Sequence, residues 1–86
     1  MNFEYDNDKS CSNRNKHGID FLEAQGLWDD VNRIEIPARV QNETRFFVIG
    51  QLLERHWSAV ITYRQNNIRI ISVRRSTPKE IRIYEG

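Results

Sequence analysis

“HWSAVITYRQNNIRIISVRR”, residues 56–75, contains two runs in which apolar and polar side chains alternate. An alternation of period two predicts β-strands, here over 56–64 and 68–75. The “QNN” between them (65–67) includes two asparagines, which tolerate the positive φ values of tight hairpin turns. The stretch therefore predicts an antiparallel hairpin.

The length of the turn in this hairpin decides which arginines share a face of the sheet. A three-residue turn aligns Arg64 with Arg74, whereas a two-residue Asn-Asn turn aligns it with Arg69 and Arg75. The sequence does not decide between these registers. In both of them, at least one arginine of the second strand lies on the face of Arg64.

Three earlier segments also alternate with period two: “NFEYD” (2–6), “RIEIPA” (33–38) and “TRFFVIGQL” (44–52). Pro37 lacks a backbone N–H, so the second segment either ends there or lies at the edge of a sheet. Together with the hairpin, these segments predict a small sheet whose later strands form an antiparallel meander.

Two helices are predicted between the first and second strands. An acidic or amide residue among 6–8 suits the N-cap of the first helix, which runs to about 15–17, and Gly18 suits its end. Asp20 and Glu23 form a capping-box pattern, so a second helix is expected to begin directly after Asp20.

A third helix is predicted at the end of the chain. Thr77 suits the N-cap, Pro78 the first helical position and Glu80 the third. The element order is then β-α-α-β-β-β-β-α. This is the α+β class, with a small antiparallel sheet, two N-terminal helices on one face and a short C-terminal helix, in a single domain over residues 1–86.

The composition bounds the class of protein. Of 86 residues, 38% are hydrophobic and 29% charged, which favours a small domain that gains stability from a partner chain. Cys11 is the one cysteine, so no intrachain disulfide is possible, and we expect it to be a small packed side chain. The two histidines are far apart in sequence, so no metal site is expected, nor any other cofactor.

The N-terminus is acidic and polar, with no apolar stretch typical of a signal peptide. The longest apolar runs are a few residues long, which is too short to span a membrane. We therefore expect a soluble cytoplasmic protein.

The net charge of +1 conceals an asymmetry between the two halves of the chain. Residues 1–43 contain five basic and nine acidic side chains, a net charge of −4. Residues 44–86 contain eight basic and three acidic side chains, a net charge of +5. A basic half of this kind can bind a polyanion through its phosphates, or its arginines can simply solvate a sheet face.

The arginines of the predicted hairpin favour a phosphate site, because a guanidinium presents a fixed fork of donors to phosphate oxygens. Tyr84, on the predicted last helix, is available to stack on a base or to bond a phosphate oxygen. The other interpretation is a solvated sheet whose arginine stems cover apolar surface. Both interpretations stay open.

Candidates for proton transfer are few. Lys16 and His17 lie at a predicted helix end, where cations commonly complement the helix dipole. Histidine is nevertheless the side chain suited to proton transfer near neutral pH, so His17 is a candidate. His56 precedes a tryptophan at a strand start, and we interpret it as structural.

Four stretches in this order resemble one known family: “FEYD” (3–6), “NRNKHGIDFLEA” (13–24), “ETRFFVIG” (43–50) and “IRIISVRRSTPKEIRIYE” (68–85). The chain resembles the BrnT family of bacterial type II toxins, which are small ribonucleases with a RelE-like fold. The resemblance covers most of the chain.

The resemblance implies a toxin that cleaves RNA and halts translation until a BrnA-type antitoxin binds it. Such antitoxins carry a ribbon-helix-helix segment that binds promoter DNA, so the DNA contact would belong to the antitoxin complex. The resemblance also implies a heterotetramer in which toxin and antitoxin dimers combine. The alternatives are a non-catalytic RNA-binding module and a protein-interaction module.

The family pattern carries over to seven residues of this sequence. These are Lys16, His17, Arg45, Arg64, Arg74, Glu80 and Tyr84. Our hypothesis is metal-independent cleavage, in which arginines hold the phosphate and His17 or Lys16 transfers the proton. In it Arg64 and Arg74 bind the phosphate with help from Arg75, Tyr84 orients the nucleotide or shares the proton transfer, and Glu80 supports the site. Arg45, Arg69 and Arg82 are further RNA-binding candidates.

Overall fold

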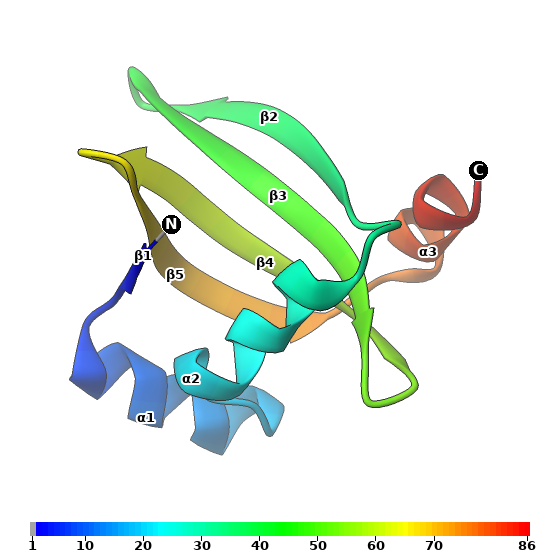
Figure 1. Ribbon diagram of the computed structural model, residues 1–86, viewed down its shortest axis with the longest axis horizontal. Helices are drawn as coiled ribbons and strands as arrows, with labels where there is room; N and C mark the ends of the chain where they lie inside the picture. Colours follow the sequence, from blue (N-terminus) through cyan, green and yellow to red (C-terminus); the bar gives the residue numbers. More distant parts are fainter. Residues whose placement is uncertain (1) are drawn as a thin grey trace.

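The computed structural model describes residues 2–86 and contains a five-stranded sheet with helices before and after it (Figure 1). The strands are β1 (Asn2–Glu4), β2 (Ile34–Val40), β3 (Glu43–Leu52), β4 (Arg55–Arg64) and β5 (Asn67–Arg75). The helices are α1 (Asn7–His17), α2 (Phe21–Ala24), the 3-10 helix η1 (Gln25–Asp29) and α3 (Pro78–Glu85). The predicted α+β class and element order are confirmed, and the fold is consistent with a RelE-like one. No helix within residues 2–86 is long and apolar enough to cross a membrane.

The predicted helix ends are confirmed because they depend on local chemistry. Asp6 caps α1 by accepting hydrogen bonds from two backbone N–H groups, and Gly18 follows α1 with a φ of 80°. Asp20 and Glu23 form the predicted capping box of α2. The second helix is α-helical for four residues and then continues as the 3-10 helix η1.

The strands lie in the order β1-β5-β4-β3-β2. All neighbouring pairs are antiparallel except β1 and β5, which run parallel. β2 is an edge strand, which explains how Pro37 is accommodated within it. Each of the three hairpins turns through two residues at positive φ, and none of these residues is glycine.

The register of the β4–β5 hairpin differs from both alternatives considered for it. The turn consists of Gln65 and Asn66, at φ values of 49° and 71°, so Arg64 pairs with Asn67. A β-bulge then follows, in which Ile71 has no partner on β4. The bulge shifts the alternation of β5 by one residue.

As a result, two arginines of β5 share the face of Arg64. Arg69 pairs with Thr62, and Arg74 pairs with Ser58. Because Thr62, Ser58 and Arg64 alternate on one side of β4, both arginines lie on that side, which we call the outer face. Arg75 pairs with Trp57 on the opposite side, which we call the helical face.

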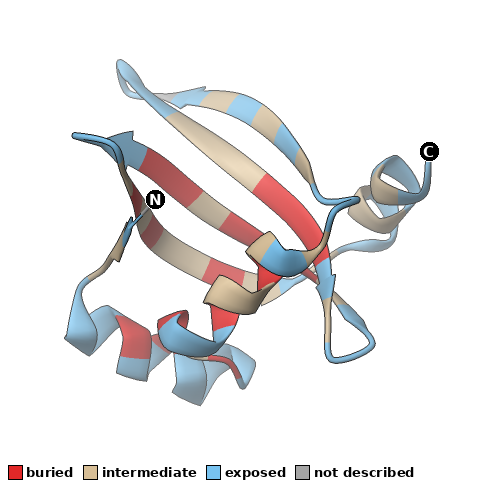
Figure 2. Ribbon diagram, viewed as in Figure 1, coloured by how far each residue is buried: buried red, intermediate tan, exposed pale blue. Residues whose placement is uncertain are grey.

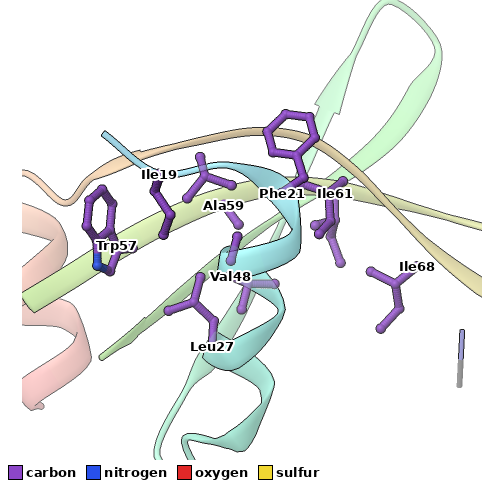
Figure 3. Close-up of a cluster of buried hydrophobic side chains, with 11 residues drawn as sticks. Ile19, Phe21, Leu27, Val48, Trp57, Ala59, Ile61 and Ile68 are labelled. Carbon is purple, nitrogen blue, oxygen red and sulfur yellow. The ribbon is translucent and has the colours of Figure 1, made fainter. Parts of the chain in front are cut away.

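The helical face carries the hydrophobic core (Figures 2 and 3). Alternate residues of β4, Trp57, Ala59 and Ile61, pack there against buried residues of the N-terminal helices such as Phe21 and Leu27. Ile61 and Leu27 are fully buried, and Phe21 is 1% exposed. Burial of side chains of this size is the main stabilising term of so small a domain.

The third helix lies against the outer face instead. Ser58, on the outer face of β4, donates a hydrogen bond of 2.9 Å from its Oγ to Glu80 Oε1 of α3. Figure 1 shows α3 at the end of the sheet, away from α1 and α2. The helices therefore cover two faces, and α3 shields the end of the outer face where β5 finishes.

Polar side chains attach α1 to the rest of the fold. Asn13 is buried, donates from Nδ2 to Val73 O at 2.9 Å and to Ile19 O at 2.8 Å, and accepts from Val73 N at 3.1 Å. These bonds occupy backbone groups of β5 that its partial partner β1 leaves unpaired. The expectation of a packed Cys11 is wrong: the thiol is exposed, and polar residues form the buried side of α1.

Candidate functional site

The first candidate region lies where β5 meets α3, and we call it the Arg74 cluster: Ser58, Arg74, Ser76 and Glu80. Arg74 donates two hydrogen bonds of 2.8 Å, from Nη1 and Nη2, to the two carboxylate oxygens of Glu80. Ser58 and the backbone N–H of Thr77 also donate to Glu80, and the Ser58 and Ser76 hydroxyls lie 2.8 Å apart. Glu80 thereby joins α3 to both β4 and β5.

This pairing changes the titration of both partners. The hydrogen bonds from Arg74 lower the pKa of Glu80 from 4.5 to about 2, and the same bonds raise the pKa of Arg74. Glu80 is therefore ionised at neutral pH and offsets much of the charge of Arg74. Nη1 of Arg74 also donates to Arg75 O, at 3.3 Å. Nε and the second hydrogen of Nη2 have no protein acceptor within residues 2–86.

The low pKa of Glu80 predicts a loss of stability in acid. A carboxylate with a lowered folded pKa stabilises the fold fully above its unfolded value of 4.5, and this stabilisation disappears as the pH falls towards 2. Allowing for the partial exposure of the pair, we expect a loss of about 1–2 kcal/mol between pH 5 and pH 2.

Urea unfolding of the wild type and of Glu80→Gln at both pH values measures this loss. The wild type should lose about 1–2 kcal/mol more than Glu80→Gln over this interval. Glu85→Gln, which alters an exposed carboxylate of the same helix, is the control and should behave as the wild type does. Equal losses in the wild type and Glu80→Gln would show that the pair contributes nothing.

Next to the Arg74 cluster, Tyr84 connects α3 to the segment before β2. Its hydroxyl donates a hydrogen bond of 2.6 Å to Asp30 Oδ2. That bond raises the pKa of Tyr84 to about 12, so the phenol keeps its proton at neutral pH. The ring of His56 meets the ring of Tyr84 edge to face, with centroids 5.1 Å apart and an interplanar angle of 78°.

The second candidate region lies at the other end of the outer face. Arg64 is exposed, and no carboxylate within residues 2–86 is within ion-pair distance of it, whereas Arg69 pairs with Glu4 at 2.9 Å. Arg74 stands opposite Ser58, six residues along β4 from Arg64, which is roughly 20 Å. Arg64 and Arg74 thus share a face but are too far apart to bind one phosphate.

The third region is a hollow of about 190 Å³ between α1 and β5. Lys16 and His17, at the end of α1, line it together with Lys9, Ile71 and Ser72, among others. Ser72 lies two residues before Arg74, or about 7 Å along the strand. Lys16 and His17 therefore lie beside the middle of β5, between the other two regions.

The remaining predicted arginines are dispersed. Arg45 pairs with Glu43 at 3.3 Å on β3, and Arg82 is exposed on α3. Arg75 lies over the ring of Trp57 at 5.7 Å from its centroid, a cation–π contact on the helical face. The predicted residues are therefore not one constellation: Arg74, Glu80 and Tyr84 lie at one end of the sheet, Arg64 and Arg69 at the other, and Lys16 and His17 between them.

Four residues of this end were not predicted from the sequence as parts of a site: Asp30, His56, Ser58 and Ser76. Asp30 follows a helix and reaches Tyr84 across 54 residues of sequence, so no local pattern indicates it. Ser58 had a detectable signal, because it alternates with Arg64. His56 has the same alternation and was assigned a structural role because a tryptophan follows it. Within residues 2–86, no three or more His, Cys, Asp and Glu side chains are grouped to bind a metal ion.

Comparison of the chain with known proteins indicates its class of activity. A family model described as the ribonuclease toxin BrnT of type II toxin-antitoxin systems matches residues 5–80. No curated protein matches the chain. The matched region includes α1, the whole sheet from β2 to β5, and the Arg74 cluster. Because the match covers most of its length, the chain belongs to the BrnT family of ribonuclease toxins.

Proposed function

We propose that this toxin is a metal-independent endoribonuclease of the mRNA interferase type, contained in one domain over residues 1–86. It cleaves messenger RNA in the cytoplasm and thereby halts translation. The observation that carries the proposal is the series of basic side chains beside β5: Arg64 of β4 and Arg69 at one end, Lys16 and His17 beside the middle, and Arg74 at α3. Such a series suits successive phosphates of a single strand better than one compact anion.

The separation of Arg64 from Arg74 assigns these arginines to different phosphates. We propose that Arg74, which keeps two unassigned N–H donors, contacts the reacting phosphate, with Tyr84 nearby. Arg75 lies on the opposite, helical face over Trp57, so its predicted help would require it to leave that ring. Arg64 and Arg69 then bind the RNA farther along, and Arg45 and Arg82 add weaker contacts at the periphery. Lys16 binds a phosphate in the hollow of α1. Proton transfer by His17 or Lys16 stays a prediction from the sequence.

The chemistry needs no metal if three requirements are met. A base takes the proton of a ribose 2′-OH as this oxygen attacks the adjacent phosphorus. Cationic donors stabilise the charge that develops on the phosphate oxygens. The bond from phosphorus to the 5′-oxygen then breaks, and that oxygen receives a proton. The products are a 2′,3′-cyclic phosphate and a free 5′-hydroxyl.

We further propose that a BrnA-type antitoxin neutralises the toxin in a heterotetramer with two copies of each chain. A ribbon-helix-helix segment of the antitoxin would bind the promoter DNA, so the toxin itself would contact DNA only through that complex. The modest share of hydrophobic residues supports stabilisation by a partner chain.

Induction of the gene in growing cells tests the proposal. We expect growth to stop, messenger RNA to be shortened, and co-expression of the neighbouring antitoxin gene to restore growth. Growth arrest without RNA shortening would favour a non-catalytic RNA-binding module. Normal growth would indicate a protein-interaction module and contradict the proposal.

A further inference from the structure

His56 lies in a part of the outer face where a side chain suited to proton transfer is close to Arg74, a hydrogen-bond donor for phosphate. It alternates with Ser58 on β4, so it shares the face of Arg74. Arg74 pairs with Ser58 and is the diagonal neighbour of His56 across the strands, a separation of roughly 7–8 Å that long side chains span. A phosphate can therefore contact both side chains.

Neighbouring residues hold the imidazole of His56 in place without forming hydrogen bonds to its ring nitrogens. Tyr84 packs against the ring edge to face, and Asp30 fixes Tyr84 through the 2.6 Å hydrogen bond. The backbone of His56 is fixed as well, because its carbonyl accepts from Ser76 N at 3.0 Å. No hydrogen bond within residues 2–86 occupies either ring nitrogen, and the residue is half-buried. An oriented imidazole with free nitrogens suits proton transfer.

We propose that His56 is a catalytic residue of this toxin, taking the proton of the attacking 2′-OH, and that Tyr84 is its positioning residue. The inference rests on the ribonuclease activity proposed above and assigns the proton transfer to β4 and α3 instead of α1. The base nitrogen of His56 accepts the 2′-OH proton while the new P–O2′ bond forms. The P–O5′ bond breaks, the 5′-oxygen takes a proton from water, and the imidazolium returns its proton to solvent.

The charged and titratable groups around His56 belong to three elements. Tyr84 of α3 contacts its ring, Asp30 of the segment after η1 binds Tyr84, and the Arg74–Glu80 pair joins β5 to α3 beside them. Tyr84 is a poor base, because its proton is held by Asp30. Arg74 is neutralised in part by Glu80 yet keeps donors for a phosphate. This leaves the imidazole as the candidate base of this region.

The test is single-turnover cleavage of a short RNA oligonucleotide in the presence of a chelator, from pH 5 to pH 9. We expect His56→Ala to cleave at least 100-fold more slowly than the wild type and to lose the acidic limb of the pH profile. Added imidazole should raise the cleavage rate of His56→Ala at least tenfold. Binding of the same oligonucleotide with 2′-O-methyl groups should change by less than threefold. Tyr84→Phe should cleave about fivefold more slowly and keep the acidic limb.

Thr44→Ala, an exposed residue of β3, is the matched control and should cleave within twofold of the wild type. A His56→Ala rate within threefold of the wild type would overturn the assignment. The assignment would also be wrong if His56→Ala lost RNA binding in proportion to its loss of rate and imidazole did not restore the rate. It would be wrong as well if His17→Ala, and not His56→Ala, lost the acidic limb and was rescued by imidazole. If the wild type itself does not cleave, the proposed function fails and the role of His56 fails with it.

Discussion

The Asn13→Ala variant should unfold with a free energy about 2–4 kcal/mol lower than that of the wild type. Asn13 is 6% exposed, and its amide serves both the N–H and the carbonyl of Val73 and the carbonyl of Ile19. Its removal leaves three buried backbone groups without partners and creates a cavity between α1 and β5. For a domain of this size, that loss is a large fraction of the total stability.

Urea unfolding at neutral pH measures the difference, and thermal unfolding should show a midpoint lowered by roughly 4–8 °C for each kcal/mol lost. Asn15→Ala is the matched control, because Asn15 is exposed on the same helix. We expect its free energy of unfolding to remain within about 0.5 kcal/mol of the wild-type value. If the two variants were equally stable, the attachment of α1 to the edge of β5 would not depend on the Asn13 amide.

The second large effect is expected at Arg74. Arg74→Ala should lower kcat/KM for RNA cleavage about 100- to 1,000-fold, because it removes the donor that we propose for the reacting phosphate. Arg74→Lys keeps the charge but not the planar fork, so it should recover only part of the activity. Steady-state kinetics with an RNA oligonucleotide measures both variants.

Glu80→Gln separates catalysis from the attachment of α3. Glutamine keeps the shape of the side chain and removes the negative charge that offsets Arg74. If Arg74 binds phosphate, Glu80→Gln should lose less than tenfold in kcat/KM despite its lower stability. If Arg74 serves only to hold α3, the two variants should lose activity equally, and the phosphate role would be wrong.

The elements that the sequence predicted correctly are those set by neighbouring residues. The N-cap of α1 at Asp6, the capping box of α2 at Asp20 and that of α3 at Thr77 each depend on contacts within a few positions. The alternation of β3, β4 and β5 is similarly local. The short β1 pairs in parallel with β5 across the whole chain, and no local pattern indicates such a pairing.

The arrangement of the site could not be predicted because it depends on two features of β5. The turn at Gln65 and Asn66 sets one register near Arg64, and the bulge at Ile71 changes it before Arg74. With this turn and no bulge, the alternation of β5 would have placed Arg75 on the outer face in place of Arg74. Tyr84 of α3 contacts Asp30 and His56, which are far from it in sequence. Tyr84 could therefore be predicted as a site residue, but its two partners could not.

Cleavage of RNA by the purified toxin in excess chelator tests the central claim most directly. The claim is that protein side chains alone, centred on the outer face near Arg74, supply the phosphate contacts and the proton transfer. We predict that the wild type produces fragments ending in 2′,3′-cyclic phosphate at an unchanged rate after chelation, and that adding purified antitoxin stops the reaction. A requirement for a divalent ion, or undiminished cleavage by Arg74→Ala, would contradict the account.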